Sequence, residues 1–142
     1  PCGNYGSKTQ PCRCSQKEIA RYLGRISGTD AMKAFYADCD VLLVPSSAET
    51  FGMVYLEAMS QGVPVLYTKG QGFDGQFPEG EIGYAVPCGD VRAQTEALKQ
   101  VTQGYAQRSQ RCVAGAEKYA WPRIAGMWMR LYQEICIEKR GV

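Results

Sequence analysis

The chain has 142 residues, of which 45% are hydrophobic, and its formal net charge at neutral pH is +2. This length is enough for one domain with one core, and the near-neutral charge without a basic stripe argues against a nucleic-acid-binding surface. No apolar run reaches the roughly 20 residues that span a bilayer, and the first residues lack a signal-peptide pattern. We therefore expect a cytoplasmic domain that binds no nucleic acid.

The cysteine and histidine content excludes several kinds of site. The seven cysteines are odd in number and lack the paired spacing of a disulfide scaffold, so we expect reduced thiols. Cys2, Cys12 and Cys14 form no CxxC pair, and the chain has no histidine to complete a zinc site. The absence of histidine also excludes a Ser-His-Asp or Cys-His nucleophile within this chain.

Residues 1–16 are polar, contain several glycine and proline residues, and show no hydrophobic periodicity. This composition predicts an irregular segment. Because no first strand is recognisable ahead of the elements described next, we expect the chain to be a fragment.

A strand, a loop, a helix and a second strand are predicted in the middle of the chain. The run DVLLVPS is apolar, rich in Val and Leu, and interrupted by Pro45, which is typical of a strand covered on both faces. Gly62 and Pro64 form a helix stop, because glycine tolerates the left-handed cap and proline cannot continue a helix. The predicted elements are a strand at 40–46, a loop at 46–51, a helix at 53–61 and a strand at 63–67.

Two carboxylates lie eight positions apart across the start of this helix. In a parallel sheet covered by helices, the loop that carries Glu49 lies at the carboxyl end of the strand, where ligands bind in open α/β folds. Glu57 is the only ordinary acid or base between Thr50 and Thr68. Because the surrounding run predicts burial, its charge needs a partner. Helical side chains lean toward the N-terminus, so we expect both glutamates to face one cleft.

The chemistry of this cleft suits a nucleotide that carries a sugar. The free backbone N–H groups around Phe51, Gly52 and Met53 form a partial positive end suited to a phosphate. Carboxylates, by contrast, accept hydrogen bonds from sugar hydroxyls. On spacing alone an alternative stays open, in which Glu57 ties down a neighbouring backbone and Glu49 is a solvated loop acid.

A glycine-rich segment follows the second strand. Gly70, Gly72 and Gly75 form a G-x-G-x-x-G pattern, but the residues after it, QFPEG, cannot open the helix that a dinucleotide fingerprint requires. We predict a loop. Its residues Gln71, Phe73 and Asp74 either line the cleft or belong to a surface turn.

The C-terminal third predicts three helices. Asp90 is a helix cap, and the helices are expected at 91–101, at 105–119 and from Pro122 onward. The last one carries an apolar stripe, in which we expect Trp128 to belong to the core, with a ligand platform as the alternative; the stripe comprises Ile124, Met127, Trp128, Leu131 and Ile135. Its basic residues form a solvated polar face or touch anionic lipid head groups; they are Arg123, Arg130, Lys139 and Arg140.

Several motifs in order resemble one known family. The segment ETFGMVYLEAMSQGVPV, at 49–65, resembles the E-x7-E signature of retaining GT-B glycosyltransferases. Its flanks agree: YLGRIS at 22–27, AFYADCDVLLVPS at 34–46, GYAVPCGD at 83–90 and KYAWPRIAGMWMRLYQEI at 118–135. The resemblance covers about residues 22–137 and implies an α/β fold, a Rossmann-like parallel sheet with helices on both faces, as in the C-terminal half of a GT-B fold.

The resemblance implies roles for matching positions. It places Glu49 at the donor sugar hydroxyls as the candidate catalytic residue, and Glu57 at the ribose hydroxyls. The other implied donor-binding residues are Thr50, Phe51, Gly52 and Met53 at the sugar or diphosphate, and Gly24, Arg25 and Ile26 beside the nucleobase. The substrate is then a nucleoside diphosphate sugar, and no metal is expected, because helix-end amides and basic side chains stabilise the leaving diphosphate.

The implied function is that of one donor-nucleotide-binding domain over residues 1–142. A complete enzyme of this family also has an N-terminal acceptor domain, which this chain lacks, so we expect no activity from the chain alone. Two alternatives stay open. One is a non-catalytic module that binds a sugar nucleotide or phosphate. The other is a structural domain that self-associates through the face that would meet the acceptor domain. Part of the apolar stripe on the last helix is expected to be exposed at that face.

Overall fold

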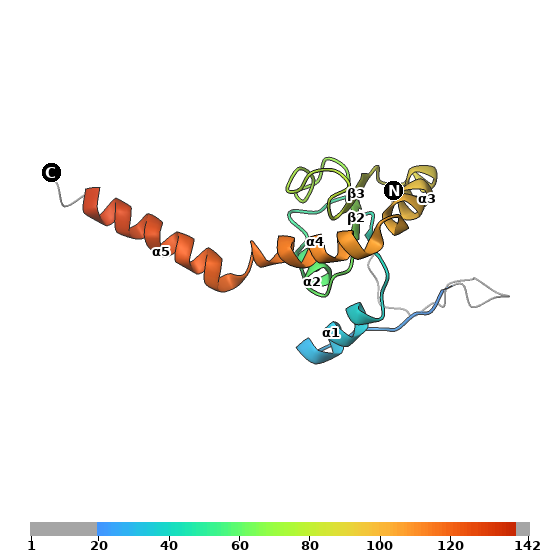
Figure 1. Cartoon of the computed structure of the whole chain (residues 1–142), viewed down its shortest axis with the longest axis horizontal. Coiled ribbons are helices and arrows are strands. Elements are labelled where there is room, and N and C mark those ends of the chain that lie inside the picture. Colours follow the sequence, from blue (N-terminus) through green and yellow to red (C-terminus); the bar gives the residue numbers. More distant parts are fainter. Residues whose placement is uncertain (1–19, 139–142) are drawn as a thin grey trace.

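A computed structural model describes residues 20–138 of the chain. The predictions for residues 1–16, for Cys2, Cys12 and Cys14, and for Lys139 and Arg140 lie outside the described residues. Figure 1 shows the described elements in chain order: α1 (Thr29–Ala37), β1 (Leu42–Val44), α2 (Met53–Ser60), β2 (Val65–Thr68), β3 (Gly83–Val86), α3 (Val91–Thr102), α4 (Tyr105–Glu117) and α5 (Trp121–Glu138).

The three described strands form one parallel sheet in the order β1-β2-β3. The predicted Rossmann-like parallel sheet is therefore confirmed. The predicted helix at 53–61 and strand at 63–67 differ only at their ends. The Val63 N–H donates to the Ala58 carbonyl (3.1 Å) and closes α2, and Pro64 has no N–H to donate. The ladder therefore begins at Val65, which pairs with Leu42 on one side and Gly83 on the other.

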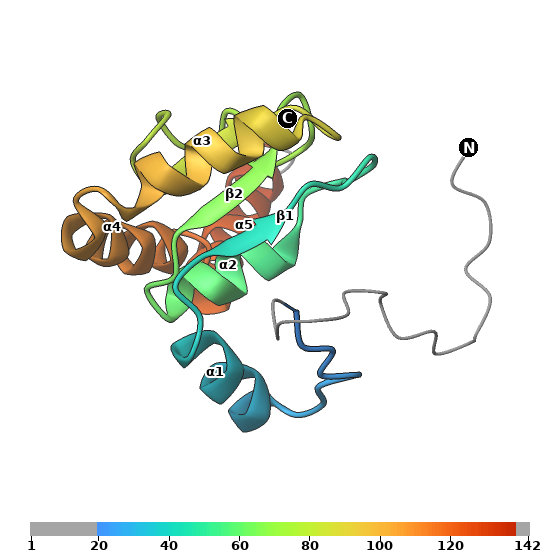
Figure 2. The same cartoon turned by 90° about the vertical axis from the view of Figure 1, so that its right-hand side faces the viewer.

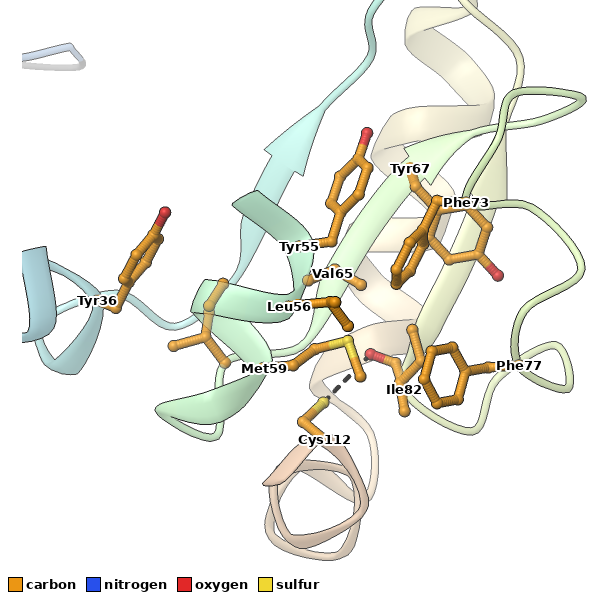
Figure 3. Packing of buried hydrophobic residues seen from close by; sticks show 12 residues of the cluster. Tyr36, Tyr55, Leu56, Met59, Val65, Tyr67, Phe73, Phe77, Ile82 and Cys112 are labelled. Carbon is orange, nitrogen blue, oxygen red and sulfur yellow. Dashed lines mark hydrogen bonds between the residues drawn. The ribbon is translucent and has the colours of Figure 1, made fainter. Parts of the chain in front are cut away.

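Helices cover both faces of the sheet, as predicted. Successive residues of a strand point to opposite faces, and in β2 Val65 and Tyr67 pack toward α2 while Leu66 packs toward α3. Figure 2 shows α3 on one side of the sheet and α2 with α4 on the other. The larger core lies on the α2 side (Figure 3) and includes Tyr55, Leu56, Met59, Phe73, Phe77, Ile82 and Cys112.

The last helix extends away from the sheet. Figure 1 shows α5 projecting beyond the end of α4. The prediction that Trp128 belongs to the core is wrong, because its side chain is 54% exposed. Met127, Leu131 and Ile135 of the same apolar stripe are also exposed. None of the helices between residues 20 and 138 is long and apolar enough to cross a membrane.

Candidate functional site

The loop that joins β1 to α2 begins at the carboxyl edge of the sheet, and side chains from its neighbours hold its first residues. The hydroxyl of Tyr55 donates to the Val44 carbonyl (3.0 Å). The hydroxyl of Thr68, at the end of β2, donates to the Ser46 carbonyl (2.8 Å). Both donors are buried, so the start of the loop is fixed to the core.

The peptide groups around Glu49 are held by the glycine-rich segment after β2. The N–H of Glu49 donates to Oε1 of Gln71 (2.9 Å), and the N–H of Gly72 donates to the Glu49 carbonyl (3.4 Å). A Cβ atom at Gly72 would lie 1.6 Å from the carbonyl oxygen of Thr50, so only glycine fits there. The Thr50 N–H donates to Oε1 of Glu49 (3.0 Å), which orients that carboxylate.

Aromatic packing fixes the second half of the loop. The Phe51 ring lies edge-on to Phe73, with ring centroids 5.9 Å apart, and 5.7 Å from the Tyr119 ring. Gly52 adopts the left-handed conformation at φ 79°, and a Cβ there would lie 2.3 Å from the Tyr55 ring. Burial, followed by the charge of Glu49, raises the pKa of Tyr55 above its ordinary value.

The glycine-rich segment is a loop, as predicted, but it does not present all three predicted residues to a cleft. Phe73 is 1% exposed and belongs to the core, so its prediction as a cleft-lining residue is wrong. Its ring is drawn among the aromatic rings on the α2 side of the sheet (Figure 3). Gln71 contacts Glu49, as described above, and Asp74 accepts from the Gly70 N–H (2.7 Å).

Three amides at the start of α2 make no hydrogen bond within the described residues. Among residues 20–138, the N–H groups of Phe51, Gly52 and Met53 have no hydrogen-bond partner, whereas the N–H of Tyr55 donates to the Gly52 carbonyl (2.9 Å). Free amides at a helix N-terminus carry a partial positive charge and bind phosphate or carboxylate groups. These amides follow Glu49 closely in the chain.

Glu57 lies on the outer face of α2. The prediction that it is buried is wrong, since its side chain is exposed while Leu56 and Ala58 beside it are buried. Oε2 of Glu57 accepts a hydrogen bond from the hydroxyl of Tyr36 (3.3 Å). Tyr36 itself is 3% exposed. Burial, together with the charge and hydrogen bond of Glu57, raises its pKa to about 12.

An open hollow of about 420 Å³ lies between α1 and α2 at this position. Its walls are mostly polar or hydroxyl-bearing residues, namely Gly28, Thr29, Met32, Lys33, Tyr36, Glu57, Ser60 and Gln61. Glu57 also lines a second surface hollow, against α4, and Glu49 lines neither of the two. The structure thus differs from the single cleft predicted for both glutamates.

The structure groups only part of the predicted set. Glu49, Thr50, Phe51, Gly52 and Met53 form one continuous stretch at the carboxyl edge. Figure 2 shows the segment before α1 apart from the sheet, at the end of α1 away from β1, whereas the loop after β1 continues from the arrowhead of that strand. That segment contains Gly24, Arg25 and Ile26. Their placement beside a nucleobase stays a prediction.

Sequence reasoning missed two residues that support the site. Tyr36 holds the Glu57 carboxylate from α1, and Thr68 holds the start of the loop from β2. Thr68 could have been found, because a polar residue at the carboxyl end of a buried strand faces the neighbouring loop. Tyr36 carried no signal, since its contact spans 21 positions in a tertiary arrangement. Among residues 20–138, no three His, Cys, Asp or Glu side chains are grouped to hold a metal ion.

Comparison with known proteins identifies relatives for this arrangement. The model of the family "Glycosyl transferases group 1" matches residues 8–119. The chain is 35% identical over 123 residues to a phosphatidyl-myo-inositol mannosyltransferase of Mycobacterium leprae, covering 83% of this chain and 32% of that protein. It is 30% identical over 144 residues to a D-inositol 3-phosphate glycosyltransferase of Corynebacterium urealyticum, covering 94% and 34% of the two proteins.

Among solved structures, the sucrose-phosphate synthase of Thermosynechococcus elongatus is similar in fold as well as in sequence. It matches with a TM-score of 0.60 and 29% identity, over 73% of this chain and 27% of that one. The chain spans about a third of the length of these curated relatives. By the extent of the family match and the identity to these relatives, the chain belongs to the group 1 glycosyltransferases.

Proposed function

We propose that this chain is the donor-binding domain of a glycosyltransferase that moves a sugar from a nucleoside diphosphate sugar to an acceptor with retention at the anomeric carbon. The observation that carries the proposal is the loop at the carboxyl edge of the sheet. There the amides of Phe51, Gly52 and Met53, which make no hydrogen bond within residues 20–138, adjoin a carboxylate, Glu49, whose backbone is held on both sides. Membership of the group 1 family supports it.

Each part of the loop has a role in this reaction. The amides receive the diphosphate and stabilise the negative charge that develops on it as the bond to the sugar breaks. The carboxylate of Glu49 accepts hydrogen bonds from donor sugar hydroxyls and orients the anomeric carbon. Glu57 accepts from the ribose hydroxyls, and Tyr36 keeps that carboxylate in place. No metal is required in this scheme, so chelation should not weaken donor binding.

The acceptor would be bound by a domain outside this chain. In a two-domain enzyme the reacting atoms lie between the domains, so the donor domain alone binds without efficient transfer. We therefore propose that the described domain contributes donor recognition and leaving-group stabilisation. Acceptor choice belongs to the other domain.

Ligand-observed NMR of the purified chain with UDP, GDP, ADP and their sugar conjugates tests this function. We expect one nucleotide to bind selectively. We also expect Glu49→Gln to weaken binding of the sugar conjugate more than binding of the bare nucleotide. Glu57→Gln should weaken binding of both. Each lost hydrogen bond to a carboxylate should raise Kd by roughly tenfold, on the order of 1.5 kcal/mol.

Glu134→Gln is a matched control, because it makes the same charge change on the exposed α5. It should leave Kd unchanged. A chain that binds none of these nucleotides, or binding that Glu49→Gln and Glu57→Gln leave intact, would overturn the proposal. Repeating the titration with a chelator tests the metal-free scheme.

A second candidate function is an interaction domain, which the exposed apolar side of α5 favours. Met127, Trp128 and Leu131 lie along one side of that helix with their side chains exposed. In this alternative the chain self-associates through α5, and its size in sedimentation velocity increases with concentration. Trp128→Ala should then abolish the increase without affecting nucleotide binding.

A further inference from the structure

The side chain of Gln71 makes a contact that the sequence motifs do not assign. Its Oε1 accepts the Glu49 N–H at 2.9 Å, across 22 positions of the chain. The adjacent Gly72 N–H donates to the carbonyl of the same residue. Residue 49 is therefore held at both of its backbone polar groups by one short segment after β2.

That segment is itself anchored, so it can hold a fixed position. The N–H of Gln71 donates to the Thr68 carbonyl (3.3 Å), and the N–H of Asp74 donates to the Gln71 carbonyl (2.9 Å). Phe73, two positions after Gln71, is buried among the rings of Phe51, Tyr55, Tyr67 and Phe77. Gln71 thus projects from a turn fixed to the core on both sides.

The two peptides on either side of Glu49 are held by different groups. The Glu49 carboxylate accepts the N–H of Thr50, in the peptide that follows Glu49, and Gln71 holds the peptide that precedes it. The conformation of residue 49, and with it the direction of the carboxylate, depends on both peptides. Among residues 20–138, the side chain of Gln71 is the only side chain that bonds to the Glu49 backbone. Without it, the Glu49 N–H would bond to water, the preceding peptide would lose its side-chain restraint, and only the Gly72 and Thr50 N–H bonds would orient residue 49.

We infer that Gln71 is a positioning residue for the donor site: its amide oxygen orients the Glu49 peptide and thereby aims the Glu49 carboxylate at the donor sugar. This inference rests on the proposed function of Glu49. It predicts that Gln71 acts on the sugar through Glu49 rather than through a contact of its own. It also predicts that changing Gln71 affects sugar recognition more than recognition of the bare nucleotide.

A double-mutant cycle on the 142-residue chain tests this dependence. The probe is the nucleotide sugar that the unchanged chain binds best, and ligand-observed NMR gives Kd for the unchanged chain, Gln71→Ala, Glu49→Ala and the double variant. We expect Gln71→Ala to raise Kd about three- to tenfold, the effect of one hydrogen bond. In the Glu49→Ala background the same change should have little further effect on Kd, because the effects of substituting two coupled residues do not add.

A second readout needs no ligand. In the ¹H–¹⁵N spectrum, Gln71→Ala should shift the Glu49 amide resonance and speed its hydrogen exchange. Gln71→Glu keeps an acceptor oxygen at the same reach and should leave that exchange slow. Gln76→Ala is the matched control, since it removes a glutamine from the same loop that contacts Gly72 and Tyr119 but not Glu49.

The outcomes separate this inference from the proposed function. If the unchanged chain binds no nucleotide sugar, the proposed function fails, and with it the role assigned to Gln71. If the chain binds and Glu49→Ala weakens binding, an unchanged Kd in Gln71→Ala overturns this inference alone. An equal effect of Gln71→Ala in both backgrounds would also overturn it, and so would a Gln76→Ala variant that matches Gln71→Ala in Kd and in Glu49 exchange.

Discussion

The two glutamates of the loop and helix differ in how the fold holds them. Glu49 is fixed by backbone hydrogen bonds to the segment after β2 and by the packing of Phe51 against the core. Glu57 is exposed, and in the described part of the chain one hydroxyl, that of Tyr36, holds its side chain. The first position depends on the packed core, whereas the second depends on how α1 lies against α2.

This difference has a consequence for binding. A group held rigidly before the ligand arrives loses little freedom on binding, so its interactions contribute more fully. Glu49 is organised in this way. Glu57 lies in an open hollow whose other wall is α1, and its geometry changes whenever α1 moves. Substitutions in the core should therefore alter the position of Glu49 more than that of Glu57. Substitutions on α1 should alter only the position of Glu57.

The largest effect is expected from Phe73→Ala, which removes the ring that anchors the segment holding Glu49. The ring is buried and contacts four other aromatic rings, so the change should lower the free energy of unfolding by about 3–5 kcal/mol. Urea denaturation followed by circular dichroism measures this loss. Trp128→Ala on the exposed α5 is the control and should change stability by less than about 0.5 kcal/mol. Equal losses of stability in the two variants would contradict the placement of Phe73 in the core and of Trp128 on the exposed α5.

A smaller effect is expected from Gly72→Ala. The new Cβ would meet the Thr50 carbonyl oxygen at 1.6 Å, so the two loops must separate, at a cost of about 2–3 kcal/mol. Nucleotide-sugar binding should weaken as well, because Glu49 moves with Thr50. At Gly75 in the same loop an added Cβ would meet no atom within 4 Å, but the backbone has a φ of +84°. Gly75→Ala should therefore lower the free energy of unfolding by about 1 kcal/mol. A ranking with Gly75→Ala as the more damaging change would show that the two loops do not touch as described.

The sequence predicted the elements of the core well, because their signals are local. Gly62 and Pro64 end α2 in the structure as their chemistry requires, and the Asp90 carboxylate caps α3 by accepting the Ala93 N–H (3.0 Å). Short apolar runs bounded by such residues indicate buried strands, and this signal does not depend on distant parts of the chain. The predicted parallel sheet follows from the alternation of these strands and helices.

The exposure of Glu57 could also have been predicted. Met53, Glu57 and Ser60 recur at helical spacing, and all three are exposed in the structure, so one face of α2 is turned outward. The apolar character of the whole run concealed this face. The resemblance predicted that part of the stripe on α5 is exposed, and it is. An apolar stripe alone does not indicate what the helix packs against, so the exposure of Trp128 in particular could not be predicted. The contact of Gln71 with Glu49 likewise depends on how two loops meet at the sheet edge.

The smallest effect at neutral pH is expected from Tyr36→Phe, which removes the one hydroxyl that holds Glu57. At 3.3 Å this hydrogen bond is long, and its loss should lower stability by about 0.5–1 kcal/mol. The effect changes at high pH, because the pKa of Tyr36 is raised from 10.0 to about 12 in the folded chain. Between these values the unfolded chain loses the proton while the folded chain keeps it, so stability is fully present below pH 10 and falls as the pH rises toward 12.

Tyr36→Phe should therefore reduce the loss of stability between pH 10 and 12 by on the order of 1 kcal/mol. Urea midpoints at several pH values measure the slope. Some loss should remain, because burial also raises the pKa of Tyr67 and of Cys112 to about 12. Tyr132→Phe on the exposed α5 is the control and should leave the slope unchanged. If Tyr36→Phe and the unchanged chain lose stability equally, the Tyr36 hydroxyl is neither buried nor hydrogen-bonded to Glu57 as described.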